Sequence, residues 1–379
     1  MISNLAILEN KVITKKNRFP LIAAHKNELK KIFNNQKVLI FGAAGSIGSA
    51  FVLNILKYKI KNLYLVDKNE NELVELNRCV VLVNKKINVE YICNDINEFE
   101  LNKFIKANKI NIFLNFAAIK HVRSEENIYT LKYLFDTNCN NCFNFTPTKY
   151  LKKVFFISTD KASDPSSLMG VSKKIMEQKL FFKKKKYKKN FFSSVRFANV
   201  SFSNGSILKM INDKINSGQN FGIPLNIKRF FITHNEAVNL CLKSLTKEAN
   251  GMILIPNEVT LGKQISIFEL LIKILKHYKI KNRIYKNFIH TKKFKISLIS
   301  KKIVGQKNSE ILYSDGEFLN IKKLDKNTIL IKPKIIVGAA KIIKKFIFKK
   351  EIIHVKEKLL KHFKNISISK ESIKLSKNL

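Results

Sequence analysis

The stretch Lys37-Val-Leu-Ile-Phe-Gly-Ala-Ala-Gly-Ser-Ile-Gly48 decides the fold of this 379-residue chain. Its first five residues predict a buried parallel strand, and a helical pattern follows over residues 50–56. Between them Gly42, Gly45 and Gly48 form Gly-x-x-Gly-x-x-Gly. The first glycine permits a tight turn, the second lets a pyrophosphate approach the backbone, and the third lets helix and strand pack closely. With the N–H groups that begin the helix, including those of Ser46 and Ile47, this stretch predicts a dinucleotide-binding site.

The second predicted strand, residues 63–67, ends in Asp67, about twenty residues after the glycines. An acid at this point accepts hydrogen bonds from the adenosine ribose and favours NAD. Lys68 follows it. A cation there can meet a 2′-phosphate, so NADP stays open.

Two further strand ends are predicted to reach the same cofactor site. The strand at 89–96 carries a terminal acid, Asp95, that we expect to contact the adenine, and the strand at 110–118 ends in two small residues where the backbone must pass close to the cofactor. The cofactor contacts expected from these two ends are Asp95, Ile96, Ala117, Ala118 and Lys120.

A second informative stretch is Val154-Phe-Phe-Ile-Ser-Thr-Asp-Lys-Ala-Ser-Asp-Pro-Ser-Ser-Leu-Met-Gly-Val-Ser-Lys173. Residues 154–157 predict a buried strand that delivers Thr159, Asp160 and Lys161 to the carboxyl edge of the sheet, where open α/β sheets bind ligands. After a turn at 164–167, Met169 and Lys173 lie four residues apart on one face of a helix. These five residues are the candidate catalytic group.

Taken in order, these motifs resemble those of the UDP-N-acetylglucosamine 4,6-dehydratases of polysaccharide biosynthesis, a group of the extended short-chain dehydrogenases. The resemblance covers roughly residues 37–260. Its segments are the glycine loop (42–48), Ala-Ala-x-Lys-His-Val (117–122), Ser-Thr-Asp-Lys-Ala (158–162), Met-Gly-x-Ser-Lys (169–173), Arg-Phe-Ala-Asn-Val (196–200), Ser-Asn-Gly-Ser (203–206) and Lys-Arg-Phe-Phe-Ile-Thr (228–233). Short-chain dehydrogenases normally carry Tyr where this chain has Met169, and the Met form is typical of the large membrane-anchored members of the group.

The resemblance implies a doubly wound parallel (Rossmann) sheet with a smaller α/β substrate lobe, bound NAD and a nucleotide-sugar substrate. A 4,6-dehydratase oxidises the sugar at C4, removes the C5 proton and the C6 hydroxyl, and returns the hydride to C6. Lys161 is then the expected C5 base and Asp160 the C6 acid, which requires a lowered pKa for Lys161 and a raised pKa for Asp160. Lys173 is expected on the nicotinamide ribose and Thr159 on the C4 oxygen. Met169 can only pack.

Substrate contacts are expected from loops beyond the sheet. Arg229 is the preferred diphosphate contact, because Arg binds phosphate in a bidentate manner that Lys does not match. Arg196, at the end of a predicted buried strand, is the alternative and can instead pair structurally. The expected substrate-binding residues are His121, Asn199, Ser203, Gly205, Ser206 and Arg229.

The chain departs from the family pattern at two places. The family's Arg-Pro-Gly-Glu-Lys-x-x-Glu is matched by Ile303-Val-Gly-Gln-Lys-Asn-Ser-Glu310, which lacks the Arg that helps hold the diphosphate. The family's His-Val-Pro is His121-Val122-Arg123, so the substrate can differ from the commonest one.

Three functions remain open. We favour a nucleotide-sugar 4,6-dehydratase, with or without inversion at C5. A 4-epimerase or reductase of the same superfamily is the second, although a plain epimerase needs a Tyr at position 169. The third is a catalytically decayed protein that still binds NAD.

The net charge of +43 limits the partners less than its size suggests. Of the 71 basic residues only six are Arg, which indicates codon drift in an AT-rich genome instead of a surface shaped for nucleic acid. The chain has no Trp and no nucleic-acid-binding motif. We therefore expect no nucleic-acid partner, leave weak contact with anionic membrane surfaces open, and expect a cytoplasmic homo-oligomer. Cys139 and Cys142 are interpreted as packing residues, and no metal site is expected.

The predicted organisation has four parts. Residues 1–36 form a polar extension, and residues 37–200 with 234–260 form the NAD-binding domain. Residues 201–233 with 261–345 form the substrate lobe, and residues 346–379 form a basic helical or disordered tail.

Overall fold

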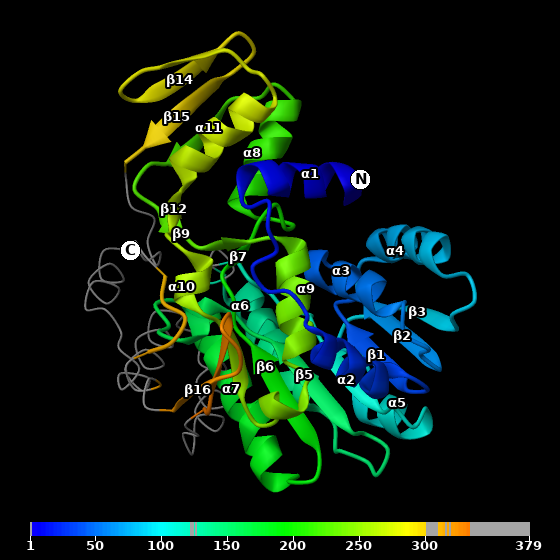
Figure 1. Ribbon diagram of the computed structural model, residues 1–379. Helices are drawn as coiled ribbons and strands as arrows, with labels where there is room; N and C mark the ends of the chain where they lie inside the picture. The colour runs from blue at the N-terminus through cyan, green and yellow to red at the C-terminus, as the bar shows by residue number, and fades with distance from the viewer. Residues whose placement is uncertain are drawn as a thin grey trace.

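The computed structural model describes residues 2–121, 125, 127–300, 310–314, 317 and 320–333 (Figure 1). Within them the main feature is a nine-stranded sheet. From edge to edge its strands are β16 (Ile321–Lys323), β17 (Thr328–Ile331), β11 (Ile253–Pro256), β6 (Phe191–Val195), β5 (Lys153–Ile157), β4 (Ile112–Asn115), β1 (Lys37–Phe41), β2 (Asn62–Asp67) and β3 (Val89–Cys93). The order β3-β2-β1-β4-β5-β6, all parallel, is that of a doubly wound dinucleotide-binding sheet, so the predicted fold class is confirmed.

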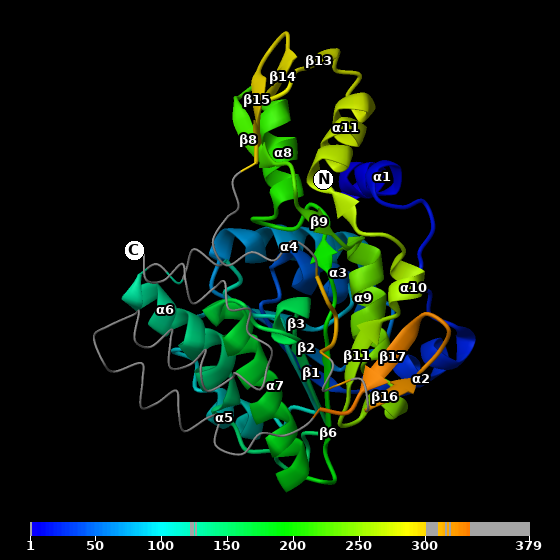
Figure 2. The same ribbon diagram turned by 90° about the vertical axis from the view of Figure 1, so that its left-hand side faces the viewer.

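Helices cover both faces of this sheet (Figure 2). On one side lie α2 (Ala23–Phe33), α3 (Ser46–Ile55) and α9 (His234–Lys243), and on the other α5 (Leu101–Ala107), α6 (Ile128–Phe135) and α7 (Leu168–Lys186). Helix α4 (Glu70–Val83) packs beside α3. Strands buried on both faces need continuous apolar sequence, which explains the runs at 38–41 and 154–157.

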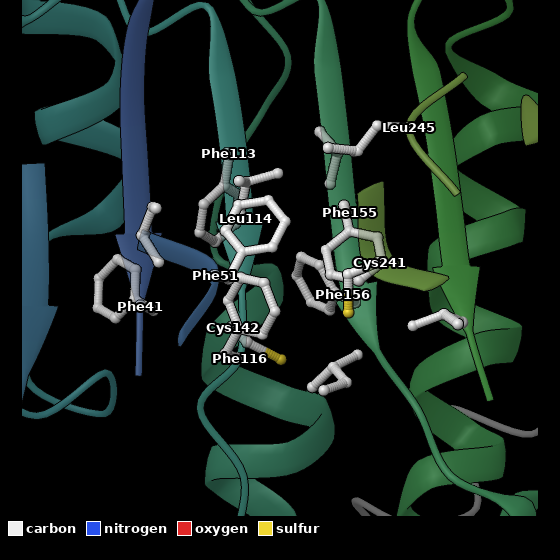
Figure 3. Packing of buried hydrophobic residues seen from close by; sticks show 14 of the residues in the cluster. Phe41, Phe51, Phe113, Leu114, Phe116, Cys142, Phe155, Phe156, Cys241 and Leu245 are labelled. Carbon is white, nitrogen blue, oxygen red and sulfur yellow. The ribbon is translucent and has the colours of Figure 1, made fainter. Parts of the chain in front are cut away.

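Aromatic rings fill much of the space around the central strands (Figure 3). The ring of Phe113 on β4 meets that of Phe156 on β5 nearly edge-on, with centroids 5.5 Å apart. The ring of Phe51 on α3 packs against that of Phe116, just after β4. Such pairs add about 0.5–1.5 kcal/mol each beyond area burial, and they hold the strand ends in a fixed frame.

A smaller lobe lies above the sheet in Figure 1 and has its own apolar cluster. It contains α8 (Ile207–Asn216), β8 (Phe221–Pro224), α11 (Ile267–His277), β13 (Asn282–Ile284), β14 (Phe288–Thr291) and β15 (Lys295–Ile299). The last three strands and β8 form one small sheet, in which β15 pairs with β8 in parallel.

The N-terminal residues join both parts of the protein, a role that their polar sequence does not reveal. Helix α1 (Ile2–Val12) packs against α11, and its Leu8 and Val12 belong to the small lobe's cluster. Phe19 and α2 belong to the large core. Between them Arg18 forms a two-pronged ion pair with Glu236 of α9, through Nε to Oε1 and Nη2 to Oε2, both at 2.8 Å.

One part of the predicted division into domains is wrong. Residues 261–345 were assigned to the substrate lobe, yet β17 pairs antiparallel with β11 and β16 extends the same edge. The apolar run at 328–331 therefore returns to the large sheet, where it covers an otherwise exposed edge. The predicted tail at 346–379 lies outside the described residues. No helix in the described part of the chain is long and apolar enough to span a membrane.

Candidate active site

The glycine loop between β1 and α3 is shaped to receive an anion. Gly42 has φ of +68°, and a Cβ on Gly48 would lie 2.0 Å from the Gly42 oxygen. These two positions must stay glycine for the turn to form. At Gly45 an added Cβ would meet only the Gly42 oxygen within 4 Å, at 3.5 Å. The fold therefore tolerates a side chain at Gly45, and the space that it would fill lies at the N-terminus of α3, where phosphate is favoured.

Asp67 ends β2 beside this loop and accepts a hydrogen bond from the Ala44 N–H at 3.0 Å. The predicted adenine-side residues are joined through Tyr133 of α6, which the sequence did not single out. Lys68 Nζ donates to the Tyr133 hydroxyl at 3.0 Å, and that hydroxyl donates to Asp95. The hydrogen bond that Lys68 donates to Tyr133 raises the pKa of this lysine, so it stays charged. Ile96 beside them is buried.

The segment after β4 is held against α7 by a buried amide. Asn138 Oδ1 accepts from the Ile119 N–H, and its Nδ2 donates to the Ile119 oxygen and to Ser172 Oγ, all at 2.9 Å. This clamp holds the segment that carries Ala117, Ala118 and Lys120. Desolvation and the positive charge of Lys161 lower the pKa of Lys120. Lys120 is therefore close enough to Lys161, which follows β5, for the two charges to repel each other.

The 203–206 loop closes over the glycine loop. The Asn204 N–H donates to Ser46 Oγ at 2.8 Å. Gly205 has φ of +70°, and a Cβ there would lie 2.5 Å from His121 Nε2, so only glycine fits against this ring. The 203–206 loop therefore contacts both the glycine loop and His121, so the structure brings these three sequence segments together. Ser203 and Ser206 share a turn, in which the Ser206 N–H donates to the Ser203 oxygen, and the Ser206 side chain caps α8.

The candidate catalytic residues lie at the carboxyl end of β5. Thr159 Oγ1 donates to Asp160 Oδ1 at 2.6 Å, and Lys161 Nζ lies 3.2 Å from the same oxygen. Asp160 is only 4% exposed. Lys161 Nζ also lies 3.4 Å from Oε1 of Glu310, a residue 149 positions away to which the sequence assigned no role.

Glu310 gathers the polar groups predicted to bind substrate. Its carboxylate accepts from Asn199 Nδ2 at 2.8 Å and forms an ion pair with Arg229 Nε at 2.9 Å. Both partners come from short strands, β7 (Asn199–Val200) and β9 (Lys228–Arg229). The Gln264 side chain binds the Glu310 backbone at both its N–H and its oxygen. Arg229, the preferred diphosphate contact, therefore engages a carboxylate of the protein in this structure.

The pKa directions in this cluster are opposite to those expected from the sequence. Burial alone would raise the pKa of Asp160, but the Lys161 charge and the Thr159 hydroxyl outweigh it and lower that pKa. Burial would lower the pKa of Lys161, but the charges of Asp160 and Glu310 raise it. Burial and the Asp160 charge raise the pKa of Glu310 to about 7. Asp160 is therefore a carboxylate, Lys161 a cation, and Glu310 the group that titrates near neutrality.

Lys173 and Met169 occupy the first turns of α7. Lys173 Nζ donates to the Ile157 oxygen at 3.2 Å, and desolvation lowers its pKa to about 8. The Met169 side chain is 2% exposed and belongs to the main core, while its backbone N–H donates to Glu125.

Behind the cluster, Arg196 is fully buried and binds two glutamates, as the structural alternative for this residue predicted. It donates to both oxygens of Glu177 at 2.6 Å and to both oxygens of Glu317 at 2.8 Å. Lys174 adds a 2.7 Å contact to Glu317. These bonds attach Glu317 to α7, and Arg196 Nη1 also donates to the Leu312 oxygen, two residues from Glu310, at 3.3 Å.

Comparison with known proteins gives the family. The sequence profile of the polysaccharide biosynthesis protein family matches residues 38–332. An uncharacterized membrane protein of Methanocaldococcus jannaschii is 28% identical over 79% of this chain and 86% of its own length. The capsular polysaccharide biosynthesis protein CapD of Staphylococcus aureus is 26% identical over 64% of this chain and 41% of that longer protein. An inverting UDP-N-acetylglucosamine 4,6-dehydratase of Campylobacter jejuni is 26% identical, covering 59% of this chain and 68% of the enzyme.

Solved structures agree with this placement. Pen from Bacillus thuringiensis superposes with a TM-score of 0.67 at 25% identity, over 80% of this chain and 91% of Pen. The dTDP-glucose 4,6-dehydratase DesIV of Streptomyces venezuelae has the same fold, with a TM-score of 0.56 at 13% identity, over 87% of this chain and 98% of DesIV. The chain belongs to the polysaccharide biosynthesis protein family, within the extended short-chain dehydrogenase fold.

Proposed function

We propose that this protein is an NAD-dependent nucleotide-sugar 4,6-dehydratase, with UDP-N-acetylglucosamine as its preferred substrate. The observation that carries the proposal is the buried Asp160–Lys161–Glu310 cluster at the carboxyl end of β5. A carboxylate, a cation and a carboxyl that titrates near pH 7 supply what a proton removal coupled to loss of a hydroxyl requires. The relative from Campylobacter jejuni supports the choice of sugar.

The residues around the glycine loop fit a dinucleotide. The open side of Gly45 at the start of α3 suits the pyrophosphate, and Asp67 at the end of β2 suits the adenosine ribose. Lys173, which approaches the β5 end, is proposed for the nicotinamide ribose. When bound there, NAD would accept hydride from C4 of the sugar and return it to C6. Since Lys68 is engaged by Tyr133, a 2′-phosphate would have to displace an existing contact, which favours NAD over NADP.

The pKa directions lead us to reassign the C5 base. Asp160 is ionised beside Lys161, so its carboxylate can remove the C5 proton, whereas Lys161 holds a proton and cannot. The cation of Lys161 then stabilises the negative charge that develops on the sugar. The Thr159 hydroxyl donates its proton to Asp160 in a hydrogen bond. The Thr159 oxygen is therefore able to accept a hydrogen bond from the C4 hydroxyl of the sugar. Met169 excludes water from this side and transfers no proton.

Incubation of the purified protein with UDP-N-acetylglucosamine in D₂O tests the proposal. The expected product is a 4-keto-6-deoxy sugar nucleotide that carries solvent deuterium at C5, seen by NMR and mass spectrometry. An Asp160→Asn variant should lose this exchange. Conversion to the C4 epimer alone would identify an epimerase. Bound NAD without turnover of UDP-N-acetylglucosamine, UDP-glucose or dTDP-glucose would identify a decayed enzyme.

A further inference from the structure

Glu9, on helix α1, is a charged residue in a buried place. It is 5% exposed, and its carboxylate binds groups 192 and 225 residues further along the chain. Ser201 Oγ and the His234 N–H both donate to Glu9 Oε1, the second at 3.1 Å, and His234 Nδ1 lies 2.9 Å from the same oxygen. Because a buried carboxylate is costly unless donors surround it, these contacts allow Glu9 to lie here. The sequence alone predicted only a polar extension in this segment.

The two residues that bind Glu9 follow two strands that lead to the substrate side of the site. Ser201 comes directly after β7, and His234 comes two residues after β10 (Phe231–Ile232). These strands pair in parallel over only two residues each, and the Ser201 N–H continues the pairing by donating to the Ile232 oxygen at 2.9 Å. So short a pair holds its register only with outside support. Glu9 supplies that support, because it joins the ends of both strands.

Both strands connect to the polar side chains around Glu310. Asn199 begins β7 and donates to Glu310 Oε2 at 2.8 Å, and Arg229, two residues before β10, forms its ion pair with the same carboxylate at 2.9 Å. Arg18 also binds β10, since its Nη2 donates to the Phe231 oxygen at 2.7 Å. The N-terminal segment therefore holds the strands next to which the proposed substrate contacts lie.

We propose that Glu9 is a positioning residue of the nucleotide-sugar site, one that sets Asn199 and Arg229 in register without touching the substrate. This role rests on the proposed dehydratase function, which assigns those two residues to the substrate. Without the Glu9 carboxylate the two strand ends lose the group that they share, and the sugar nucleotide then loses contacts that are made before the reaction begins. Among the described residues Glu9 makes no side-chain hydrogen bond to the glycine loop, so NAD binding should not depend on it.

Steady-state kinetics of the full-length protein with UDP-N-acetylglucosamine compare the wild type with Glu9→Ala. We expect KM to rise by about tenfold while kcat stays within about threefold, because a lost ground-state contact acts on binding. NAD affinity, measured by calorimetry, should be unchanged. Glu9→Gln keeps an oxygen acceptor for the His234 N–H and should restore most of the affinity. Asn10→Ala, at an exposed neighbour on the same helix, should match the wild type.

Leu8→Ala separates the positioning role from a general loosening of α1. Leu8 is 4% exposed and belongs to the small lobe's apolar cluster, so its truncation should lower the melting temperature. The hydrogen bonds of Glu9 remain in this variant, and we expect KM within about threefold of the wild type. If Glu9 served stability alone, KM would instead follow the loss of melting temperature in both variants.

The outcomes separate the two proposals. If the wild type binds UDP-N-acetylglucosamine but forms no 4-keto-6-deoxy product, the dehydratase function fails, and the calorimetric affinities of the same variants for this sugar nucleotide still decide the role of Glu9. If the wild type neither binds nor converts any sugar nucleotide, both proposals fail. If the wild type is active but Glu9→Ala keeps KM within about twofold, lowers kcat instead, or raises KM no more than Leu8→Ala does, only the role of Glu9 is overturned.

Should Glu9→Ala fail to fold, Ser201→Ala replaces it, because this change removes a donor to the same carboxylate. We expect its KM to rise by about threefold or more. A wild-type KM for Ser201→Ala would overturn the role of Glu9.

Discussion

Arg196 donates through Nε and Nη2 to the two carboxylate oxygens of Glu177, each at 2.6 Å, in a fully buried site. Glu177 lies on α7 and Arg196 just after β6, so the pair joins the helix that carries Lys173 to the centre of the sheet. The same guanidinium binds Glu317 and, through the Leu312 oxygen, reaches the segment that carries Glu310. One buried cation therefore joins three parts of the candidate active site.

Removing this cation should be strongly destabilising. Arg196→Met leaves Glu177 and Glu317 buried with Lys174 as the remaining cation of the network, and we expect a loss of about 3–5 kcal/mol in the free energy of unfolding. Urea denaturation measures it. The exposed pair Arg78–Glu75 offers a matched control, because Arg78→Met should cost at most about 1 kcal/mol. Equal losses in the two variants would contradict the structural role of Arg196.

Gly45→Val should separate cofactor binding from folding. Its backbone angles, φ of −62° and ψ of 164°, suit any residue, and the added side chain meets little protein. We therefore expect a melting temperature close to that of the wild type and loss of NAD binding by calorimetry. Gly48→Ala should behave in the opposite sense and destabilise the fold, because its Cβ would overlap the Gly42 oxygen. A Gly45→Val protein that binds NAD normally would place the pyrophosphate elsewhere.

Lys161→Met should shift the acid limb of the pH profile to higher pH. Lys161 lowers the pKa of Asp160, so its removal raises that pKa. Since Asp160 must be ionised to take the C5 proton, C5 exchange at low pH should be lost first, and raising the pH should restore part of it. The rate of deuterium uptake between pH 4 and 8 measures this. Complete loss of exchange at every pH would return the role of base to Lys161.

Met169→Leu should be tolerated and Met169→Tyr should bring no gain. The side chain is 2% exposed in the main core, where a volume-conserving apolar change costs under about 1.5 kcal/mol. A tyrosine there would place a larger side chain and a hydroxyl among apolar neighbours. Product formation and melting temperature of both variants check the expectation. A hundredfold rise in activity for Met169→Tyr would mark the wild type as a decayed catalyst.

The sequence predicted the sheet and most of the converging segments because both depend on local patterns. Parallel strands end at one edge of a sheet, so the glycine spacing and the apolar runs were enough to predict that Gly45 and Asp67 lie close together. The same reasoning placed Asp160 and Lys161 at the end of β5. The pKa directions were missed because burial was considered without counter-charges. In the structure, each of these two residues is the main counter-charge of the other.

Glu310 was missed for a different reason. Its segment comes 149 residues after Lys161, and the family pattern around it has lost its Arg, so the whole segment was interpreted as a departure. The final glutamate of that pattern is nevertheless retained, and this was the available signal. Tyr133 and the role of α1 had no comparable signal, since each depends on a tertiary contact between segments without a motif.

The placement of α1 affects the order in which the protein is assembled during synthesis. Helix α1 leaves the ribosome long before α11, which begins at residue 267, yet its apolar residues Leu8 and Val12 pack in one cluster with that helix. Arg18 likewise waits for Glu236. Helix α1 therefore has no partner while the residues between it and α11 are synthesised, and during that time it is exposed to chaperones and to other nascent chains. The small lobe can complete its apolar cluster only when α1 and α11 meet, which makes the docking of α1 a late step in folding.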